Sequence, residues 1–440
     1  PESLPPRGKE EVRVSMDVCS DQRTSGRAGQ DRSAYPGPAT KAFRQGTHRL
    51  VPPEETLARV QPLMLAMGIT RIANITGLDV IGLPVVMACR PNSRSLAVSQ
   101  GKGLTLVAAK ASGLMESVEA YHAERITLPL KLGSCEELSS THQLVDVTGL
   151  PRTTTSRFHP GLRLLWVEGR DLLRDGPVWV PYEVVHIDFT PECQIGGGCF
   201  VCSSNGLAAG NHVLEAISHG ICEVVERDAA SLWFLLSEEE KQRTRTDVEG
   251  VDDPLCREAL ERYERAGLSV AIWETTQDIR IPSFRCVVTE REHNPLHVLY
   301  SAEGYGCHPT RSIALLRAMT EAAQSRLTVI AGTRDDVLRS DYERFLNLDA
   351  FDRLRATIEV AAPMNSFRDG PGTDAATLDE DVAWELDRLR DAGSRQVVVI
   401  DLTKPEFELP VVRVVIPGLE LSVPDCLLGV RARDRLGRRA

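Results

Sequence analysis

The chain has 440 residues, enough for one large domain or roughly two to three ordinary ones, and its 42% hydrophobic residues suffice for a packed core. A net charge of -11 argues against nucleic acid or an anionic membrane as the main partner. No apolar run reaches about 18 residues and the N-terminus carries no secretory signal, so we expect a cytoplasmic protein without a membrane span.

The N-terminal part of the chain is expected to consist of a disordered tail followed by the start of the ordered domain. Residues 1–45 are rich in Pro, Gly, Ser, Arg and Asp, have almost no apolar periodicity and predict a disordered tail. Order is expected to begin near Gly46, with a short helix from Pro53 to Gly68. Residues 69–91 are β-branched and interrupted by glycine, which predicts two strands around a turn.

The first motif of interest is Gly101-Lys102-Gly103, which precedes a helix expected over residues 104–124. A short glycine loop lets the backbone approach a phosphate closely, but the spacing of a Walker A motif is absent, so the loop alone is weak evidence. One polar stripe of the helix, beside an apolar stripe, carries Ser112, Glu116 and Glu119.

Residues 125–200 combine strands with a cluster of cysteines. The segments 162–173 and 177–189 are expected to be strands joined at Asp175-Gly176, a common hairpin pair. Most of the 11 cysteines are expected to be reduced thiols. A zinc clip with His212 as a conceivable fourth ligand is one interpretation of the cluster, and unligated thiols are the default. The three clustered residues are Cys193, Cys199 and Cys202.

The central motif is a polar, glycine-bearing loop over residues 203–211 that opens into a helix with two opposed stripes. One stripe is apolar, and the other has no lysine and contains Glu215, His219, Glu223 and Glu226. A surface helix with a solvated acidic face would give this pattern. A metal and phosphate site at a helix start would give it too.

A third glycine-containing segment, residues 303–306, precedes a helix expected over residues 309–332. This helix carries Glu321 and Gln324 on the side opposite an apolar stripe. Three such units, far apart in the sequence, are difficult to attribute to surface solvation, so they favour one shared site.

The remaining segments complete a mixed pattern of helices and strands. Further helices are expected over 253–267 and 379–392. Further strands are expected over 268–276, 281–290, 296–301, 395–403 and 409–420. The basic residues 430–440 are expected to be disordered.

Clustered carboxylates with few histidines suit Mg²⁺, which prefers oxygen ligands and is usually shared with phosphates. Lys102 and Arg227 could neutralise further phosphate charge. A di-iron carboxylate site is an alternative, because Glu119 and His122 form a Glu-x-x-His step, but that class needs a second such motif on a four-helix bundle.

Three segments, 112–124, 203–229 and 303–326, resemble the YcaO family and occur in the same order. The resemblance covers residues 46–418 and leaves 419–440 as a C-terminal extension. It implies an α+β fold of β-sheets packed by helices, with a site for ATP and Mg²⁺ between Glu-bearing helices. It also implies an ATP-dependent enzyme that phosphorylates the oxygen of a peptide backbone amide while a nucleophile attacks the carbonyl carbon.

The resemblance implies a role for each matching residue. Mg²⁺ would be bound by Glu116, Glu119, Glu223 and Glu226. ATP would be held by Lys102, Ser112, Asn211, Glu215, Glu321, Gln324 and Arg326, the last of which lies off the polar stripe of its helix. The residues expected to act in catalysis are Glu116, Glu223 and Arg227.

Two segments, 321–336 and 410–420, look like the branch of the family that is paired with TfuA-type proteins and linked to thioamide formation. Azoline-forming members often end in Pro-x-Pro-x-Pro, whereas this chain ends in Arg-Leu-Gly-Arg-Arg-Ala. We therefore expect thioamidation of a ribosomally made peptide or protein, with a sulfide donor, a TfuA-like partner and a homodimer. An azoline-forming cyclodehydratase and a non-catalytic nucleotide-binding accessory protein are the alternatives.

Overall fold

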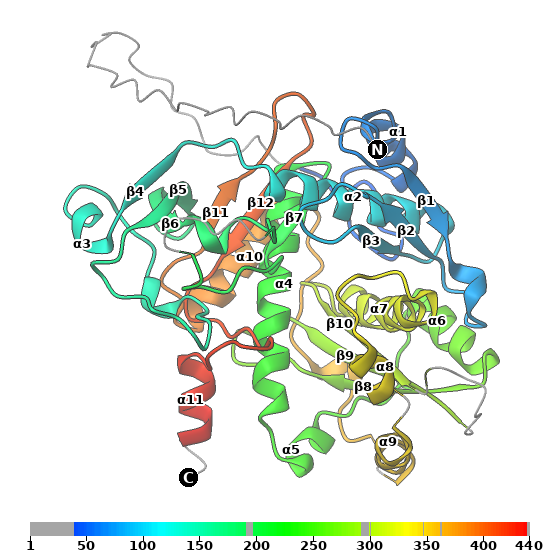
Figure 1. Cartoon of the computed structure of the whole chain (residues 1–440). Helices are drawn as coiled ribbons and strands as arrows, with labels where there is room; N and C mark the ends of the chain where they lie inside the picture. The colour runs from blue at the N-terminus through cyan, green and yellow to red at the C-terminus, as the bar shows by residue number, and fades with distance from the viewer. Residues whose placement is uncertain are drawn as a thin grey trace, which may run out of the picture. The chain divides into compact units, whose positions relative to one another are not determined.

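The computed structural model describes residues 39–190, 197–291, 299, 301–345, 347–360 and 363–437, all within one unit, Gly37–Ala440. In these ranges the strands form three antiparallel sheets, and helices pack against them (Figure 1). The expected α+β fold is confirmed. No helix in the described ranges combines the length and apolar character needed to cross a membrane.

The first sheet has the strand order β1 (Arg71–Asn74), β2 (Val85–Cys89) and β3 (Val98–Lys102). It follows α1 (Pro53–Val60), which is shorter than expected because Pro62 converts its end into a 3₁₀ turn. The helix α2 (Leu106–Glu124) packs on β3 and begins at Thr105, whose side chain accepts a hydrogen bond from the Ala108 amide.

The second sheet joins distant parts of the chain. Its strand order is β4 (Leu130–Gly133), β5 (Leu164–Asp171), β11 (Val398–Asp401), β12 (Val411–Val415) and β7 (Leu207–Ala209), with β6 (Gly176–Pro181) on β5. The expected hairpin is confirmed: β5 and β6 pair with Asp171 opposite Gly176, and Asp175 adopts a φ of 54° in the turn.

The third sheet has the order β10 (Ser301–Cys307), β9 (Ser283–Glu290) and β8 (Leu268–Glu274). The helices α6 (Pro254–Arg265) and α7 (Arg311–Ala331) pack on it, and α7 ends at Gly332 in the left-handed conformation.

The long helix α4 (Val213–Phe234) contacts β7 and β12 of the second sheet and β9 and β10 of the third, and Figure 1 shows it (green) standing between these sheets. α10 (Leu378–Asp391) packs along it. The other helices are α3 (Cys135–Leu138), α5 (Glu238–Arg243), α8 (Arg339–Phe345), α9 (Leu348–Val360) and α11 (Val430–Gly437). Further 3₁₀ turns occupy Thr76–Leu78, Val147–Gly149, Tyr182–Val184 and Phe367–Asp369.

Two of the three glycine segments before helices, residues 101–103 and 303–306, lie largely within strands, which corrects the expectation of open loops there; residues 203–211 form a loop that contains only the short strand β7. Gly101 lies within β3, and Gly304 within β10. A methyl group on Gly101 would overlap the backbone of Ala109 in α2, and one on Gly304 would overlap the backbone of Ala318 in α7. These glycines therefore let a strand lie directly against the following helix, rather than letting backbone approach a phosphate.

The expected disorder at both ends of the chain is wrong for the residues that the structure describes. Ala39 is buried, and Lys41 forms a buried ion pair with Asp381 of α10, so residues 39–45 pack on the domain. Residues 430–437 form α11, which ion-pairs with α4 through Arg431.

Candidate functional site

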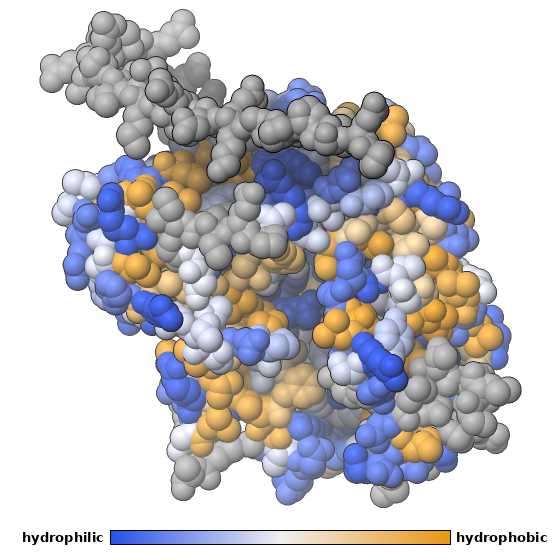
Figure 2. All heavy atoms as spheres, viewed as in Figure 1, coloured by the Kyte–Doolittle hydropathy of each residue, from blue (hydrophilic) through white to orange (hydrophobic). Residues whose placement is uncertain are grey.

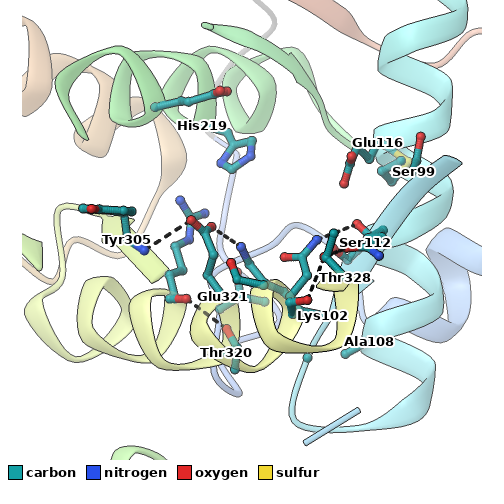
Figure 3. A pocket seen from close by; sticks show the side chains of 18 of the residues that line it. Ser99, Lys102, Ala108, Ser112, Glu116, His219, Tyr305, Thr320, Glu321 and Thr328 are labelled. Carbon is teal, nitrogen blue, oxygen red and sulfur yellow. Dashed lines mark hydrogen bonds and ion pairs between the residues drawn. The ribbon is translucent and has the colours of Figure 1, made fainter. Parts of the chain in front are cut away.

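A cavity of about 1280 Å³ lies where α2, α4 and α7 approach one another, with β3 and β10 completing its wall. Figure 2 shows a hollow with hydrophilic side chains on the face where these helices meet in Figure 1. Figure 3 shows side chains from all three helices directed into one space: Ser112 and Glu116 from α2, His219 from α4 and Glu321 from α7. The three motifs predicted to share one site are thus brought together.

The helix α4 contributes the largest set of polar side chains because its two stripes face different surroundings. The apolar stripe from Leu214 to Val224 is buried in the protein interior. The polar stripe, which lines the cavity, consists of Glu215, His219, Glu223 and Glu226. The interpretation of α4 as a surface helix with a solvated acidic face is therefore wrong, since its polar face is enclosed by α2 and α7.

The helix α2 places Ser112, Glu116 and Glu119 on the opposite wall. One oxygen of Glu119 accepts a hydrogen bond of 2.8 Å from the Ala209 amide at the end of β7, which fixes this carboxylate beside the start of α4. Glu223 of α4 raises the pKa of both Glu116 and Glu119 of α2, so the carboxylates of the two helices lie within electrostatic reach of one another.

The helix α7 contributes Glu321 and Gln324. Glu321 forms an ion pair with Lys102 of β3 and accepts a hydrogen bond of 3.2 Å from the Tyr305 amide (Figure 3). Gln324 donates to the Gln100 carbonyl at 3.2 Å. Lys102 is thus held at the end of its strand by a carboxylate, on the cavity wall where it was predicted to meet a phosphate.

Asn211 and Glu215 also line the cavity, but both are already hydrogen-bonded to protein groups. Glu215 accepts hydrogen bonds from the amides of Leu50 and Asn211, the latter at 2.7 Å. The Asn211 side chain donates to the Thr56 hydroxyl at 3.0 Å. These contacts tie the N-terminal segment of the described chain to the start of α4, so both residues shape the cavity wall.

Arg326 is the one predicted site residue that the structure places away from the cavity. Its guanidinium is buried in ion pairs with Asp79 at 2.8 Å and Glu290 at 3.1 Å. A cation that already satisfies two buried carboxylates is not available to a nucleotide. Its role in binding ATP is therefore dropped, and its position off the polar stripe of α7 explains the difference.

Burial raises the pKa of the clustered carboxyls. The pKa of Glu116 rises to about 7 through burial, partly offset by Arg334 and Lys102, and that of Glu226 rises to about 7 through burial and the neighbouring Glu321. Burial likewise raises the pKa of Glu119 and Glu223. Such carboxyls, close together and under-neutralised, form a site that a divalent cation would stabilise.

Glu321 behaves differently because it has its own cation. Burial pushes its pKa upward, but Lys102 and Arg227 outweigh burial and hold the pKa below its usual range. Glu321 is therefore ionised beside carboxyls that hold protons near neutrality. Arg227 itself lies on the exposed rim of the cavity, next to Glu226.

Five arginines that line the cavity had no role in the sequence prediction: Arg49, Arg262, Arg285, Arg317 and Arg334. Arg49 donates to the His48 carbonyl at 3.0 Å and Arg317 to the Cys307 carbonyl at 3.1 Å, and neither forms an ion pair with another described residue. Their unpaired charge suits an anionic ligand. Arg49 and Arg334 lie outside helices, so helical periodicity does not mark them. Arg317 lies on α7, and only the tertiary structure, which directs it to the cavity, distinguishes it from other helical arginines.

The oxygen-rich donor set fits Mg²⁺ and opposes the di-iron alternative. Glu119 lines the cavity, but His122, three residues later, is fully buried and packs against Phe407. The Nδ1 atom of His122 lies 2.8 Å from the Val118 carbonyl, as expected for a structural core histidine. The side chains of Glu119 and His122 therefore have different surroundings, the cavity and the protein core, and do not form one metal site.

The zinc interpretation finds no support in the described part of the cysteine cluster. Cys193 lies outside the described residues. The thiol of Cys202 donates to the His186 carbonyl at 3.1 Å, and burial raises its pKa to about 11, which disfavours the thiolate that zinc requires.

Within the described ranges, one other group of side chains could place three metal ligands together: His48, His308 and Asp381, all buried. Its contacts argue against a metal. The Nδ1 atom of His308 accepts a hydrogen bond of 2.9 Å from the Thr310 amide, so the neutral ring carries its proton on Nε2, the remaining ligand atom. Lys41 already neutralises Asp381 at 2.6 Å. This group is a buried polar contact between chain segments.

Comparison with known proteins agrees with the geometry. The family model described as "YcaO cyclodehydratase, ATP- and Mg2+-binding" matches residues 100–420. A protein of Rhizobium leguminosarum bv. trifolii, named for its place in the tfuA 3' region, is 37% identical over 391 residues, which cover 87% of this chain and 92% of that protein.

Two solved structures share the fold. A heterocyclase in complex with substrate and cofactor has a TM-score of 0.71 and 24% identity, and the match covers 88% of this chain but only 54% of that longer heterocyclase. The structure of YcaO from Methanopyrus kandleri bound with AMPPCP and Mg2+ has a TM-score of 0.69 and 23% identity, covering 87% of this chain and 95% of that one. From the family match over residues 100–420 and the 37% identical relative, the chain belongs to the YcaO family.

Proposed function

We propose that this protein uses ATP and Mg²⁺ to phosphorylate the oxygen of a peptide backbone amide, so that a nucleophile can replace that oxygen. The observation that carries the proposal is the convergence of Glu116, Glu119, Glu223 and Glu226 in one enclosed cavity. An amide is a poor electrophile, and phosphorylation turns its oxygen into a good leaving group. ATP supplies the phosphoryl group, and Mg²⁺ offsets the charge that develops on it.

The residues on the cavity wall divide into groups suited to the parts of a magnesium nucleotide. The four carboxylates of α2 and α4 would hold Mg²⁺, and Arg227 beside Glu226 would contact the phosphates. Lys102, Ser112 and Gln324, which line the cavity from β3, α2 and α7, would hold the rest of the nucleotide. Arg49 and Arg317 add positive charge on the wall formed by the N-terminal segment and α7.

The size of the cavity supports a second ligand. A site for one small molecule usually measures about 300–1,000 Å³, and this cavity measures about 1280 Å³. Part of its wall is apolar and includes Ile187, Phe189, Val287 and Leu354. These residues belong to segments other than α2 and α4, which carry the carboxylates. This part would accept a peptide segment whose amide meets the phosphoryl group.

Thioamide formation with a sulfide donor and a TfuA-type partner is the outcome that we favour. The support is the relative from the tfuA 3' region, which matches 92% of its own length. An azoline-forming cyclodehydratase is the alternative, supported by the family description and by the heterocyclase and the E. coli microcin synthetase McbBCD complex among structures of the same fold. Either outcome uses the same activation of the amide.

Mass spectrometry of a candidate peptide distinguishes these outcomes. The peptide is incubated with the protein, Mg²⁺ and ATP, with and without sulfide and a TfuA-type protein, and ADP release is measured in parallel. We expect replacement of one oxygen by sulfur, only when sulfide is present. Loss of water without sulfide would instead identify a cyclodehydratase.

The variants that test the site are Glu116→Gln on α2 and Glu223→Gln on α4. Each removes one negative charge from the cavity wall and keeps the side-chain shape. Both should abolish peptide-dependent ADP release, by about a hundredfold or more, while the protein stays folded. Unchanged ADP release in both variants would contradict the assignment of the site. Nucleotide binding without any peptide-dependent ADP release by the wild type would favour the non-catalytic accessory protein.

A further inference from the structure

The C-terminal segment 419–437 lies on α4 but outside the cavity. Figure 1 shows α11 (red) beside the C-terminal half of α4 (green), and the two helices are in contact. Among the described residues, those that line the cavity end at Leu354. The C-terminal segment can therefore act on the site only indirectly, and its contact with α4 is the one that reaches a helix carrying site residues.

The contact is centred on Asp228, the residue that follows Glu226 and Arg227 in α4. Its side chain is fully buried and accepts two hydrogen bonds from Arg431 of α11, at 3.0 and 3.1 Å. It accepts a third, of 2.9 Å, from the Glu420 amide. This bidentate arrangement fixes both the distance and the orientation between Arg431 and the helical turn that carries Asp228.

Arg431 is itself held in place from two sides. Its guanidinium also pairs with Asp278, on the connection between β8 and β9, at 2.5 Å. The Glu420 carboxylate accepts hydrogen bonds from the amides of Gly429 and Ala432 at 2.8 and 2.9 Å and so caps the start of α11. Farther along α11, Arg435 donates to the Leu232 carbonyl of α4 at 2.8 Å.

We propose that Arg431 is a positioning residue: by holding Asp228, it fixes the turn of α4 that presents Glu226 and Arg227 to the cavity. This inference rests on the proposed function, because it takes Glu226 as a magnesium ligand. Consecutive helical residues are separated by about 100° around the axis, so a turn held at Asp228 cannot rotate without moving Glu226. The C-terminal helix thus sets metal affinity without touching the metal site.

The test is a Mg²⁺ titration of the binding of a non-hydrolysable ATP analogue to the full chain. Arg431→Met, which keeps the side-chain length and removes the charge, should raise the Mg²⁺ concentration at half-saturation about tenfold or more, as loss of outer-shell support for a metal ligand does. Arg431→Lys should recover part of the loss, because it restores the charge but not the bidentate geometry.

The matched control is Arg433→Ala on the same helix, because Arg433 donates only to the Leu428 carbonyl within the C-terminal segment. It should leave the Mg²⁺ titration unchanged. Arg431→Met combined with Asp228→Asn removes both charges of the pair and should restore folding if the single variant unfolds, because no uncompensated buried carboxylate remains. The double variant should still bind Mg²⁺ weakly, since no bidentate pair holds the turn.

A folded Arg431→Met or double variant with the Mg²⁺ dependence of the wild type would overturn the positioning role. The proposed function would fail in a different way, namely if the wild type bound no Mg²⁺ with the ATP analogue or released no ADP with a modified peptide. The two failures are distinguishable because the first is a comparison between variants and the second concerns the wild type alone.

Discussion

At the scale of single residues, the site is defined by carboxyls that the folded chain does not neutralise. Glu116 and Glu226 have pKa values of about 7 because burial outweighs the charges of Lys102, Arg227 and Arg334 around them. In an enclosed cavity, two or more such groups are kept partly protonated, or they are neutralised by a cation. Metal binding must therefore displace protons.

The first prediction is that Mg²⁺ binding with an ATP analogue weakens as the pH falls. Between about pH 8 and pH 6, the Mg²⁺ concentration at half-saturation should rise about tenfold or more, because protons on Glu116 and Glu226 compete with the metal. Titrations at several pH values measure this. In Glu226→Gln one competing proton is absent, so the residual binding should depend less steeply on pH, and a flat profile for the wild type would contradict the prediction.

The same pKa shifts determine whether the free energy of unfolding of the metal-free protein rises or falls with pH. The pKa of Glu116 lies above the ordinary value of 4.5, at about 7. Between these values the folded protein binds more protons than the unfolded chain, so the free energy of unfolding of the metal-free protein falls as the pH rises through this window. Mg²⁺ with nucleotide should offset that loss by binding only the folded state.

At the scale of elements, three strand-and-helix units build the cavity: β3 with α2, β7 with α4 and β10 with α7. In the first and third, strand glycines lie against helix backbone: a side chain on Gly101 would overlap α2 and one on Gly304 would overlap α7. The distance between strand and helix is therefore fixed by backbone contact. This spacing sets how far Lys102 at the end of β3 and Glu321 on α7 can reach into the cavity.

The second prediction concerns Gly304→Ala. The added methyl group meets the backbone of Ala318 and Ala322, which cannot rotate away, so β10 and α7 must separate. We expect a loss of about 1–3 kcal/mol of unfolding free energy, measured by denaturant titration, and weaker nucleotide binding because Glu321 and Gln324 shift with α7.

Gly176→Ala is the matched control, because Gly176 is also a strand glycine but nothing lies within contact of the added group. It should change the unfolding free energy by less than about 0.5 kcal/mol. Equal stability of both variants would contradict the packing role of Gly304.

The sequence predicted the helices that carry the site better than it predicted the connections. The stripes on α2, α4 and α7 follow from helical periodicity, and α2 and α7 appear within about two residues of their expected ends, whereas α4 continues to Phe234. The glycine segments 101–103 and 303–306 were misjudged because glycine permits both a loop and close strand packing, and only the position of the next helix distinguishes the two.

Site residues were likewise predicted correctly where a local sequence pattern marks them, and not where contacts between distant segments decide their position. Eleven of the predicted residues line the cavity because they lie on polar stripes or beside glycines, and Arg326 does not because Asp79 and Glu290 are distant in sequence. Arg49 could not be predicted, since nothing local marks it and its place depends on how the N-terminal segment crosses α4. The sheet order is a further case: strands were expected over 395–403 and 409–420, but β5 and β7, which pair with β11 and β12, come from far earlier in the chain.

At the scale of the whole molecule, contacts between distant segments close the domain. Lys41 near the start of the described chain pairs with Asp381 of α10 at 2.6 Å, and both side chains are almost completely buried. α10 in turn holds α4, where the Ser218 hydroxyl donates to Glu385 at 2.6 Å. The segment that carries Arg49 is thus connected, through α10, to the helix that carries Glu223 and Glu226.

The third prediction concerns Lys41→Met. It leaves the buried Asp381 carboxylate without its cation, which should cost about 3–5 kcal/mol of unfolding free energy. Lys41→Met with Asp381→Asn should recover most of this loss, because no uncompensated charge remains. Denaturant titration measures both effects. Arg44→Ala is the control, since its pair with Asp374 is exposed and should contribute at most about 1 kcal/mol.

The cavity wall draws on residues from Phe43 to Leu354. During translation, a chain that is still being made cannot therefore complete this wall until Leu354 has left the ribosome. Until then the acidic faces of α2 and α4 would be synthesised without the ligand that neutralises them. A magnesium nucleotide that binds in this cavity could therefore stabilise the fold only after the segment up to Leu354 has been synthesised.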